Sequence, residues 1–471
     1  MIENYSNIEQ INRFLQGEKQ IAVPFSFETA DEKYIGVKVL RLVPSKRLVL
    51  EASTDSHHVV IKIFSPVKKG LQELNKEVRG HKLASDAEIK VPSLISTSED
   101  IAGCFAVIYK FVENAKSFTL SDGHVLEERV VKLLELVLKL HLYGIYQDDI
   151  HMDNVLMVNN ELYLIDLGSV VCEQKGIPLS QKASLENLAK LVAQFTVIEQ
   201  DQFVKHLEIY YQGRNWLYNN NEHDIFMLLL NKAWNKRKNN YVHKCFRTCT
   251  MTIYRHSLAR EYAFRTDFFN GFSVDIVNNI ELLMSQGEVL KAGNSATVVR
   301  IEDNGRQFVI KRYNVKGVWH FVRRCLRPSR ALVSWRNANL LEFVGLSTPK
   351  AQGFIEKRVG WFRYTAYYIC DYIQAEQLLA VYKRRQPSEV ELKQINSIFL
   401  VLKKCRVSHG DLKASNLLID NEGKVLIIDL DAMQEHKSFK SFQKAHNKDK
   451  KRFLRNWDDA KINSIFTKLI C

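Results

Sequence analysis

Long hydrophobic runs are missing from this chain. Among its 471 residues, no apolar stretch reaches the roughly 20 residues that a membrane-spanning helix needs. Residues 1–5 also lack the basic start and the apolar core of a secretory signal. These absences argue against an integral membrane protein or an exported one, and we expect the chain to work in the cytoplasm.

Paired cysteines are scarce as well. Eight cysteines are scattered through the sequence, and only Cys245 and Cys249 are close neighbours. They lie four residues apart on an expected helix, and without a second pair of cysteines or histidines they are a weak metal signal. Free thiols in a reducing compartment are the simpler interpretation.

The chain has fewer acidic than basic residues. The chain carries 67 Lys and Arg against 53 Asp and Glu, a formal net charge of +14. Such an excess favours an anionic partner: a nucleic acid, an anionic lipid surface, or a phosphorylated or carboxylated substrate. No nucleic-acid recognition motif accompanies the charge, so we expect no nucleic-acid partner.

The most informative motif begins at His409. Asp411 and Asn416 are five positions apart, as in the kinase catalytic loop H-R-D-L-x-x-x-N, and Asp429 ends an apolar run where the D-F-G aspartate is expected. In phosphoryl transfer, such an Asp accepts the proton of the attacking hydroxyl, and the Asn and second Asp hold metal ions on ATP. Lys413 is placed to neutralise the moving phosphate. The sequence therefore predicts a kinase site.

The same pattern occurs a second time, earlier in the chain. Asp149 and Asn154 are again five residues apart, and Asp166 follows an apolar run in the D-F-G position. Gln147 stands where the second copy has a histidine. We expect Asp149 to be catalytic and Asn154 and Asp166 to be metal ligands, as for the later copy.

Each copy is preceded by a β-branched run that ends in lysine. Lys62 and Lys311 both match the lysine of the V-A-I-K strand in a kinase small lobe. In the following helix, Glu77 is the expected partner of Lys62, with Glu73 as its competitor one turn earlier. The corresponding helix of the second copy offers no glutamate before Glu342.

The nucleotide-covering loops are poor in glycine. In the second copy, Gly293 lies in a small polar turn between two strand-like runs, and we expect it to help bind the nucleotide. In the first copy, the turn at residues 44–47 has no glycine, so backbone amides could approach phosphates less closely there. Aromatic and basic residues follow Lys311 and are expected either to bind anions or to form a solvated face. They are Trp319, His320, Phe321, Arg323, Arg324, Arg327 and Arg330.

An ordered repeat of lysine strand, catalytic loop and metal-binding aspartate indicates duplication. We predict an α+β protein made of two tandem bilobal protein-kinase-like domains, each with a β-rich small lobe and a helical large lobe. The first spans residues 1–272 and includes a helical connector, and the second spans residues 273–471.

The second half resembles the lipopolysaccharide kinase family, the bacterial enzymes that phosphorylate Kdo or heptose sugars of the inner core. The segments that carry the resemblance are residues 309–314, 327–331 with Trp335, 409–412, 428–431 and 451–457. It implies ATP and Mg²⁺ as cofactors and a lipid-linked core oligosaccharide as substrate. It also implies work at the cytoplasmic face of the inner membrane, where a basic surface would suit peripheral contact with anionic lipid.

Three functions remain open at this stage. The first is a sugar kinase whose chemistry lies in the second half, with the first half a second kinase or a nucleotide-binding partner. Asp411 could equally orient the Ser, Thr or Tyr hydroxyl of a protein, which would make the chain a protein kinase. The missing glycines and the missing helix glutamate motivate a third, a tandem pseudokinase scaffold with at most one active half.

Overall fold

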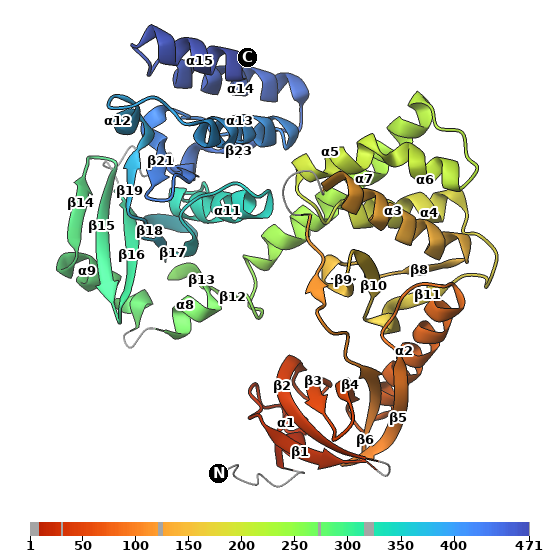
Figure 1. The fold of residues 1–471 in the computed structure, drawn as a ribbon. Coiled ribbons are helices and arrows are strands. Elements are labelled where there is room, and N and C mark those ends of the chain that lie inside the picture. Colours follow the sequence, from red (N-terminus) through yellow and green to blue (C-terminus); the bar gives the residue numbers. More distant parts are fainter. Residues whose placement is uncertain (1–8, 30–31, 121–125, 272–274, 315–324, 471) are drawn as a thin grey trace. The chain divides into compact units, whose positions relative to one another are not determined.

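The computed structural model describes residues 9–29, 32–120, 126–271, 275–314 and 325–470. The chain divides into two compact units, Met1–Trp234 and Asn235–Cys471 (Figure 1). Both combine antiparallel sheets with helices, so the fold class is α+β, as predicted. Within the described ranges, no helix is both long and apolar enough to cross a membrane.

The small lobe of the first unit is an antiparallel sheet with the strand order β1-β2-β3-β4-β6-β5. Its strands are β1 (Phe25–Glu28), β2 (Lys33–Val43), β3 (Arg47–Ser53), β4 (His58–Phe64), β5 (Leu94–Ile101) and β6 (Cys104–Lys110). Alternation along β4 sends Val59, Ile61 and Ile63 into a core that also holds Phe14 of α1 (Glu9–Leu15). The opposite face of β4 therefore carries Lys62.

Helix α2 (Lys68–Asp86) lies between β4 and β5 in the chain, and it buries one face at a helical spacing that includes Leu74, Glu77 and Leu83. Gly80 lies where α2 meets the turn after Asp166. A Cβ atom at this glycine would stand 1.9 Å from the carbonyl oxygen of Leu167. Glycine thus allows the helix to approach that turn closely.

The large lobe of the first unit is mainly helical and carries two small sheets: β8 pairs with β11, and β9 lies between β10 and β7 (Lys116–Ser117). Its elements are α3 (Leu126–Leu142), β8 (Ile145–Gln147), β9 (Val155–Val158), β10 (Glu161–Leu164), β11 (Val170–Cys172), α4 (Gln181–Val192), α5 (Val197–Lys205) and α6 (Leu207–Gly213). Helix α7 (Asn220–Lys244) runs across the boundary between the units.

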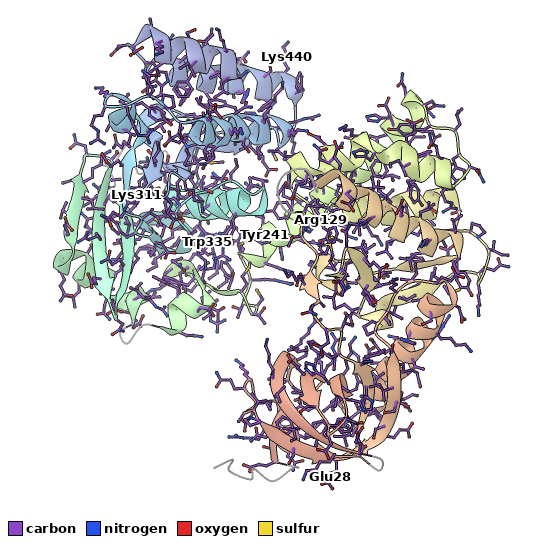
Figure 2. All side chains as sticks on the ribbon, in the orientation of Figure 1. Glu28, Arg129, Tyr241, Lys311, Trp335 and Lys440 are labelled. Atoms are coloured by element: carbon purple, nitrogen blue, oxygen red, sulfur yellow. The ribbon has the colours of Figure 1, made fainter. Side chains whose placement is uncertain are left out.

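The small lobe of the second unit is a seven-stranded sheet with the order β12-β13-β17-β18-β16-β15-β14. Its strands are β12 (Thr252–His256), β13 (Arg260–Arg265), β14 (Glu288–Ala292), β15 (Ala296–Asp303), β16 (Arg306–Tyr313), β17 (Ala351–Val359) and β18 (Phe362–Asp371). Helix α11 (Arg330–Phe343) contacts this sheet, and its Trp335 is fully buried, with Nε1 donating to the carbonyl oxygen of Cys245 at 3.1 Å (Figure 2).

The second unit begins earlier than the predicted boundary at residue 273. Strand β13 pairs with β17, with Tyr262 opposite Ile355, and Phe264 is buried in the core of this unit. Strands β12 and β13 therefore belong to the sheet of the second unit and not to a connector of the first. Pairing between strands that lie far apart in sequence is not visible in local periodicity, which is why the prediction was wrong here.

The large lobe of the second unit is again mainly helical, with a small sheet of β19, β21 and β22. Its elements are β19 (Ala375–Gln377), α12 (Leu378–Tyr382), α13 (Glu389–Lys404), β20 (Val407–Ser408), β21 (Leu417–Asp420), β22 (Val425–Ile427), β23 (Gln434–Glu435), α14 (Phe439–Leu454) and α15 (Ala460–Ile470). Helix α13 opens with a capping box between Ser388 and Glu391, which fixes where the helix begins.

Candidate active site

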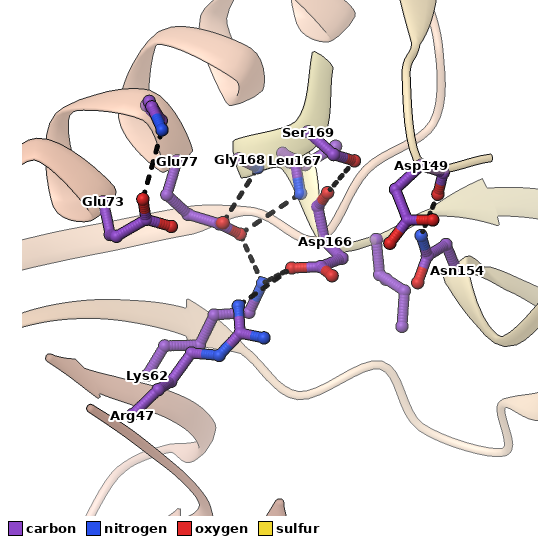
Figure 3. A network of polar contacts seen from close by, with 12 residues as sticks. Arg47, Lys62, Glu73, Glu77, Asp149, Asn154, Asp166, Leu167, Gly168 and Ser169 are labelled. Carbon is purple, nitrogen blue, oxygen red and sulfur yellow. Dashed lines mark hydrogen bonds and ion pairs between the residues drawn. The ribbon is translucent and has the colours of Figure 1, made fainter. Parts of the chain in front are cut away.

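Lys62 in the first unit lies between two carboxylates (Figure 3). Its Nζ forms an ion pair with Glu77 Oε1 on α2 and lies 3.3 Å from Asp166 Oδ1. Glu77 is only 2% exposed, so this pair is largely shielded from solvent. The lysine of the small lobe therefore reaches both the helix and the aspartate of the large lobe, as the sequence predicted for a kinase-like unit.

Glu77, and not Glu73, occupies the position beside Lys62. Glu77 also accepts the backbone N–H groups of Leu167 at 3.3 Å and Gly168 at 2.9 Å. One carboxylate thus joins α2, β4 and the turn that follows Asp166. Glu73 instead pairs with Lys76 on the exposed face of the helix, at 3.1 Å (Figure 3).

The catalytic loop of the first unit is held by side-chain amides. Asn154 Nδ2 donates to the carbonyl oxygen of Asp149 at 3.1 Å. Gln147 Nε2 donates to the carbonyl oxygens of Ile165 at 3.1 Å and Asp166 at 3.2 Å. Gln147, which stands where the second copy has a histidine, therefore connects the predicted catalytic loop to the turn at Asp166.

A cleft of about 670 Å³ opens between the sheet and the catalytic loop of the first unit. All five residues predicted for this half line it: Lys62, Glu77, Asp149, Asn154 and Asp166. Apolar side chains, among them Val49, Val60 and Leu156, line other parts of the cleft. A concave site with apolar walls and a few converging charges has the character of a small-molecule site.

Cations keep the Asp166 carboxylate ionised. Burial alone raises the pKa of Asp166, but the charges of Lys62, Arg47 and Arg41 outweigh it, so the pKa lies below its ordinary value. Arg47 NH1 lies 3.4 Å from Asp166 Oδ1. Asp166 also has a left-handed backbone, with φ 56° and ψ 55°, a conformation that aspartate tolerates better than most residues.

The second unit repeats the contact between lysine and aspartate. Lys311 Nζ on β16 lies 2.5 Å from Asp429 Oδ1. Asp429 has the same left-handed backbone as Asp166, with φ 64° and ψ 57°. Burial raises the pKa of Asp429, but the charges of Lys311, Arg330 and His409 lower it by more than burial raises it. This carboxylate too is therefore ionised at neutral pH.

A different arrangement replaces the helix glutamate in the second unit. Glu342, the acidic residue of α11, pairs with Arg265 instead of Lys311. Asp431, two residues after Asp429, pairs with Arg330 NH2 at 2.5 Å, and its Oδ2 lies 4.0 Å from Lys311 Nζ. The second carboxylate near the lysine therefore comes from the turn that follows Asp429, and the sequence analysis missed it.

A buried amide also ties α11 to that turn. Asn337 Nδ2 donates to the carbonyl oxygens of Leu430 at 2.8 Å and Met433 at 3.2 Å. Helix and turn are therefore joined in both units, by a carboxylate that accepts backbone N–H groups in the first and by an amide that donates to carbonyl groups in the second.

The catalytic loop of the second unit brings the predicted residues together. Asn416 Nδ2 donates to the carbonyl oxygen of Asp411 at 2.8 Å and to its Oδ2 at 3.3 Å. Lys413 Nζ lies 3.2 Å from Asp411 Oδ2. The Asp411 side chain is 40% exposed, which leaves it accessible to an acceptor hydroxyl.

Two buried residues, His409 and Asp449, hold this loop in position through hydrogen bonds. His409 Nε2 donates to the carbonyl oxygen of Ile428 at 3.0 Å, and burial lowers the pKa of this histidine. Asp449 of α14, 1% exposed, accepts the backbone N–H groups of His409 at 2.8 Å and Gly410 at 3.1 Å. The sequence analysis missed Asp449, whose only signal was an acid on the apolar face of a basic helix.

Gly293 lies in the turn between β14 and β15, as expected for a nucleotide-covering loop. Its N–H donates to the carbonyl oxygen of Ala296 at 3.1 Å, and its own carbonyl accepts from Asn314 Nδ2 at 3.1 Å. In the basic stretch, Trp319, His320, Phe321, Arg323 and Arg324 lie outside the described residues. Arg327 is exposed, and Arg330 reaches Asp431.

The donor sets suit a metal ion only together with a phosphate-bearing ligand. In the described part of the chain, no group of three or more His, Cys, Asp or Glu side chains could hold a metal ion. Each predicted set offers one carboxylate and one amide. Asp166 and Asn154 line the same cleft in the first unit, and in the second the N–H of Ile428, which precedes Asp429, donates to the carbonyl oxygen of Asn416 at 2.9 Å. Mg²⁺ in nucleotide sites is typically held by one or two carboxylates plus substrate phosphates, so these sets fit that ion.

One family model matches part of this chain. Residues 281–467 match the model of the Lipopolysaccharide kinase (Kdo/WaaP) family, which confirms the resemblance noted in the second half. The matched range contains Lys311, Asp411, Asn416 and Asp429. A search of curated proteins finds no significant match.

Proposed function

We propose that this chain phosphorylates a heptose or Kdo hydroxyl of the lipopolysaccharide core, using ATP in the second unit. Residues 281–467 match the model of the Lipopolysaccharide kinase (Kdo/WaaP) family, whose members are phosphotransferases. The observation that carries the proposal is the 2.5 Å contact between Lys311 and Asp429 inside the matched range. It joins the small lobe to the large lobe beside Asp411.

The residues of the second unit divide the reaction between them. Asp411 accepts the proton of the sugar hydroxyl as it attacks, and Lys413, 3.2 Å from that carboxylate, offsets the charge of the transferred phosphoryl group. Lys311 binds the phosphates of ATP. Asn416 and Asp429 would hold Mg²⁺, which neutralises charge on the phosphates when bound. Asp431 and Arg330 keep Lys311 and α11 in place.

The first unit is part of the proposal as a nucleotide-binding, kinase-like unit, which makes the chain a tandem of two such units. Its support is the cleft of about 670 Å³ and the lysine–glutamate ion pair within it. Whether this unit also transfers phosphate is decided by Asp149→Ala in the full chain. Loss of all activity in that variant would place the chemistry in the first unit.

A basic face of α14 supports peripheral contact with an anionic membrane, where the lipid-linked substrate would lie. Lysines and an arginine at helical spacing are exposed along it, namely Lys440, Lys444, Lys448, Lys451 and Arg455 (Figure 2 labels Lys440). Each basic residue near such a surface contributes about 1 kcal/mol of attraction. In a flotation experiment at low salt, the protein should float with phosphatidylglycerol vesicles, and the Lys440→Glu/Lys444→Glu variant should remain in the bottom fraction.

The experiment that tests the proposed reaction is mass analysis of core oligosaccharide from cells with and without the gene. Deletion should remove one phosphate, and a plasmid copy should restore it. Asp411→Ala should fail to restore it, whereas Glu422→Ala, which removes an exposed carboxylate from the same lobe, should succeed. Unchanged core phosphate after deletion would remove the sugar kinase and leave a protein acceptor or a scaffold.

A further inference from the structure

The turn that should cover the nucleotide phosphates in the first unit has no backbone amides to offer. It connects β2 to β3 through Pro44, Ser45 and Lys46. Proline has no N–H. The N–H of Ser45 donates to the carbonyl oxygen of Phe14 at 3.0 Å, and that of Lys46 donates to the carbonyl oxygen of Val43, also at 3.0 Å.

This turn is also fixed in place. Phe14, whose carbonyl oxygen accepts the Ser45 N–H, is fully buried in the core of the small lobe. Helix α1 therefore fixes the position of the turn. A glycine-rich loop, by contrast, presents several N–H groups to phosphate oxygens. The first unit therefore needs another group to bind phosphate if its cleft takes a nucleotide.

Two arginines flank the turn on the face of the sheet that lines the cleft. Strand pairing sets Val43 opposite Arg47 and Arg41 opposite Val49. Because residues two apart share a face, Arg41 and Arg47 lie on the same side. The pairing of Val49 with Lys62 extends that side to the site lysine. Arg41, Arg47, Val49 and Lys62 all line the cleft.

The charges already converge on one carboxylate. Arg47 NH1 and Lys62 Nζ lie 3.4 Å and 3.3 Å from the same oxygen, Asp166 Oδ1, and the charge of Arg41 also lowers the pKa of Asp166. Arg41, Arg47 and Lys62 therefore gather on the Asp166 side of the cleft, and Lys62 is also paired with Glu77. Guanidinium groups bind phosphate oxygens with paired N–H donors, which makes arginine well suited to this position.

We propose that Arg41 and Arg47 bind the phosphates of a nucleoside di- or triphosphate in the first unit, by side-chain guanidinium groups in place of the backbone amides of a glycine-rich loop. The inference rests on the proposal that this cleft takes a nucleotide. It deepens that proposal by naming the groups that recognise the phosphates.

The test measures binding of ATP and of adenosine to the full chain by calorimetry, in a Lys311→Met/Asp429→Asn background that weakens the second site. Arg47→Ala should weaken ATP binding about tenfold or more, a typical effect of losing a charge-assisted contact, and should leave adenosine binding within about twofold. Arg41→Ala should act in the same direction, and it tests the phosphate contact with the Arg47–Asp166 ion pair intact. Lys46→Ala is the matched control, because it removes an exposed cation that does not line the cleft.

The outcomes separate this inference from the proposal beneath it. Unchanged ATP affinity in both arginine variants would overturn the role of the arginines while leaving the nucleotide site intact. Equal losses for ATP and adenosine would also overturn it, since a phosphate contact acts only on ATP. Absence of any ATP or adenosine binding in this background would overturn both.

Discussion

Gln147 Nε2 donates to the carbonyl oxygen of Ile165 at 3.1 Å, and His409 Nε2 makes the equivalent bond to Ile428 at 3.0 Å in the second unit. Two different side chains thus make the same connection, between the predicted catalytic loop and the residue before the aspartate that was predicted to bind a metal ion. Because burial lowers the pKa of His409, the neutral ring donates this bond at neutral pH. Charge on the ring is not required for this connection.

We therefore expect His409→Gln to retain the stability and most of the activity, while His409→Ala is less stable and loses activity. The alanine variant leaves the Ile428 carbonyl oxygen without its donor, which costs about 1–3 kcal/mol. Urea unfolding and transfer of phosphate from ATP measure the two effects. Equal damage from glutamine and alanine would show that the ring itself, and not the hydrogen bond, is needed.

Asp449 should control turnover without touching the nucleotide. Its carboxylate holds the N–H groups of His409 and Gly410 from beneath the catalytic loop. Asp449→Asn replaces one accepting oxygen by a donor, so the loop that carries Asp411 should shift. Misplacement of a catalytic group by about 1 Å can cost on the order of 100-fold in rate.

The measurement for Asp449→Asn is kcat and the KM for ATP. We expect kcat to fall at least tenfold while KM for ATP stays within about twofold, because Lys311 and Asp429 lie on other elements. A rise in KM with an unchanged kcat would assign Asp449 to nucleotide binding instead. Asp458→Asn, a change in the segment after α14, serves as the control.

Asp431 should stabilise the second unit through Arg330. The Asp431 side chain is 9% exposed and pairs with Arg330, so Asp431→Asn leaves a partly buried guanidinium group without its counter-ion. We expect the free energy of unfolding to fall by about 1–3 kcal/mol, less than for a fully buried pair because Arg330 retains some solvent contact. Chemical denaturation measures this loss.

The control for this prediction is Glu302→Gln, which neutralises an exposed carboxylate of the same small lobe. It should change the free energy of unfolding by less than about 0.5 kcal/mol. If Asp431→Asn behaves like this control, the ion pair with Arg330 contributes nothing to stability.

His141 should make the first unit sensitive to acid. Its ring is fully buried, with Nδ1 2.6 Å from the Tyr210 hydroxyl and Nε2 3.1 Å from Asn187 Oδ1. Burial lowers the pKa of His141 from 6.5 to about 4. Between these values the unfolded chain binds a proton that the folded chain does not. The protonation of His141 therefore leaves the free energy of unfolding unchanged above pH 6.5 and lowers it as the pH drops toward 4.

The full shift corresponds to on the order of 3 kcal/mol. We expect the unfolding free energy of His141→Gln to fall less steeply than that of the unmodified chain between pH 6.5 and 4.5. His57→Gln, which changes an exposed histidine, should follow the unmodified chain. Parallel pH profiles for all three proteins would show that His141 titrates normally in the folded state.

Much of the candidate site is encoded locally. Asp411 and Asn416 are five residues apart on one loop, so their approach needs only the loop itself, and the amide reaches the Asp411 carbonyl at 2.8 Å. The lysine strands are similar, because alternation in a short β-branched run already sends Lys62 to the face opposite Val59, Ile61 and Ile63. Such features depend on near neighbours in the chain, and a sequence pattern records them.

The amino-acid sequence by itself therefore predicted the resemblance of the second half to the lipopolysaccharide kinase family, the α+β class, and the residues that the structure brings together in each unit. Tertiary packing alone decided which distant side chains meet them. It brought Asp431 and Arg330 near Lys311 and joined β13 to β17. Ion pairs and strand pairing between residues tens of positions apart follow from how elements pack, and local spacing carries no information about that.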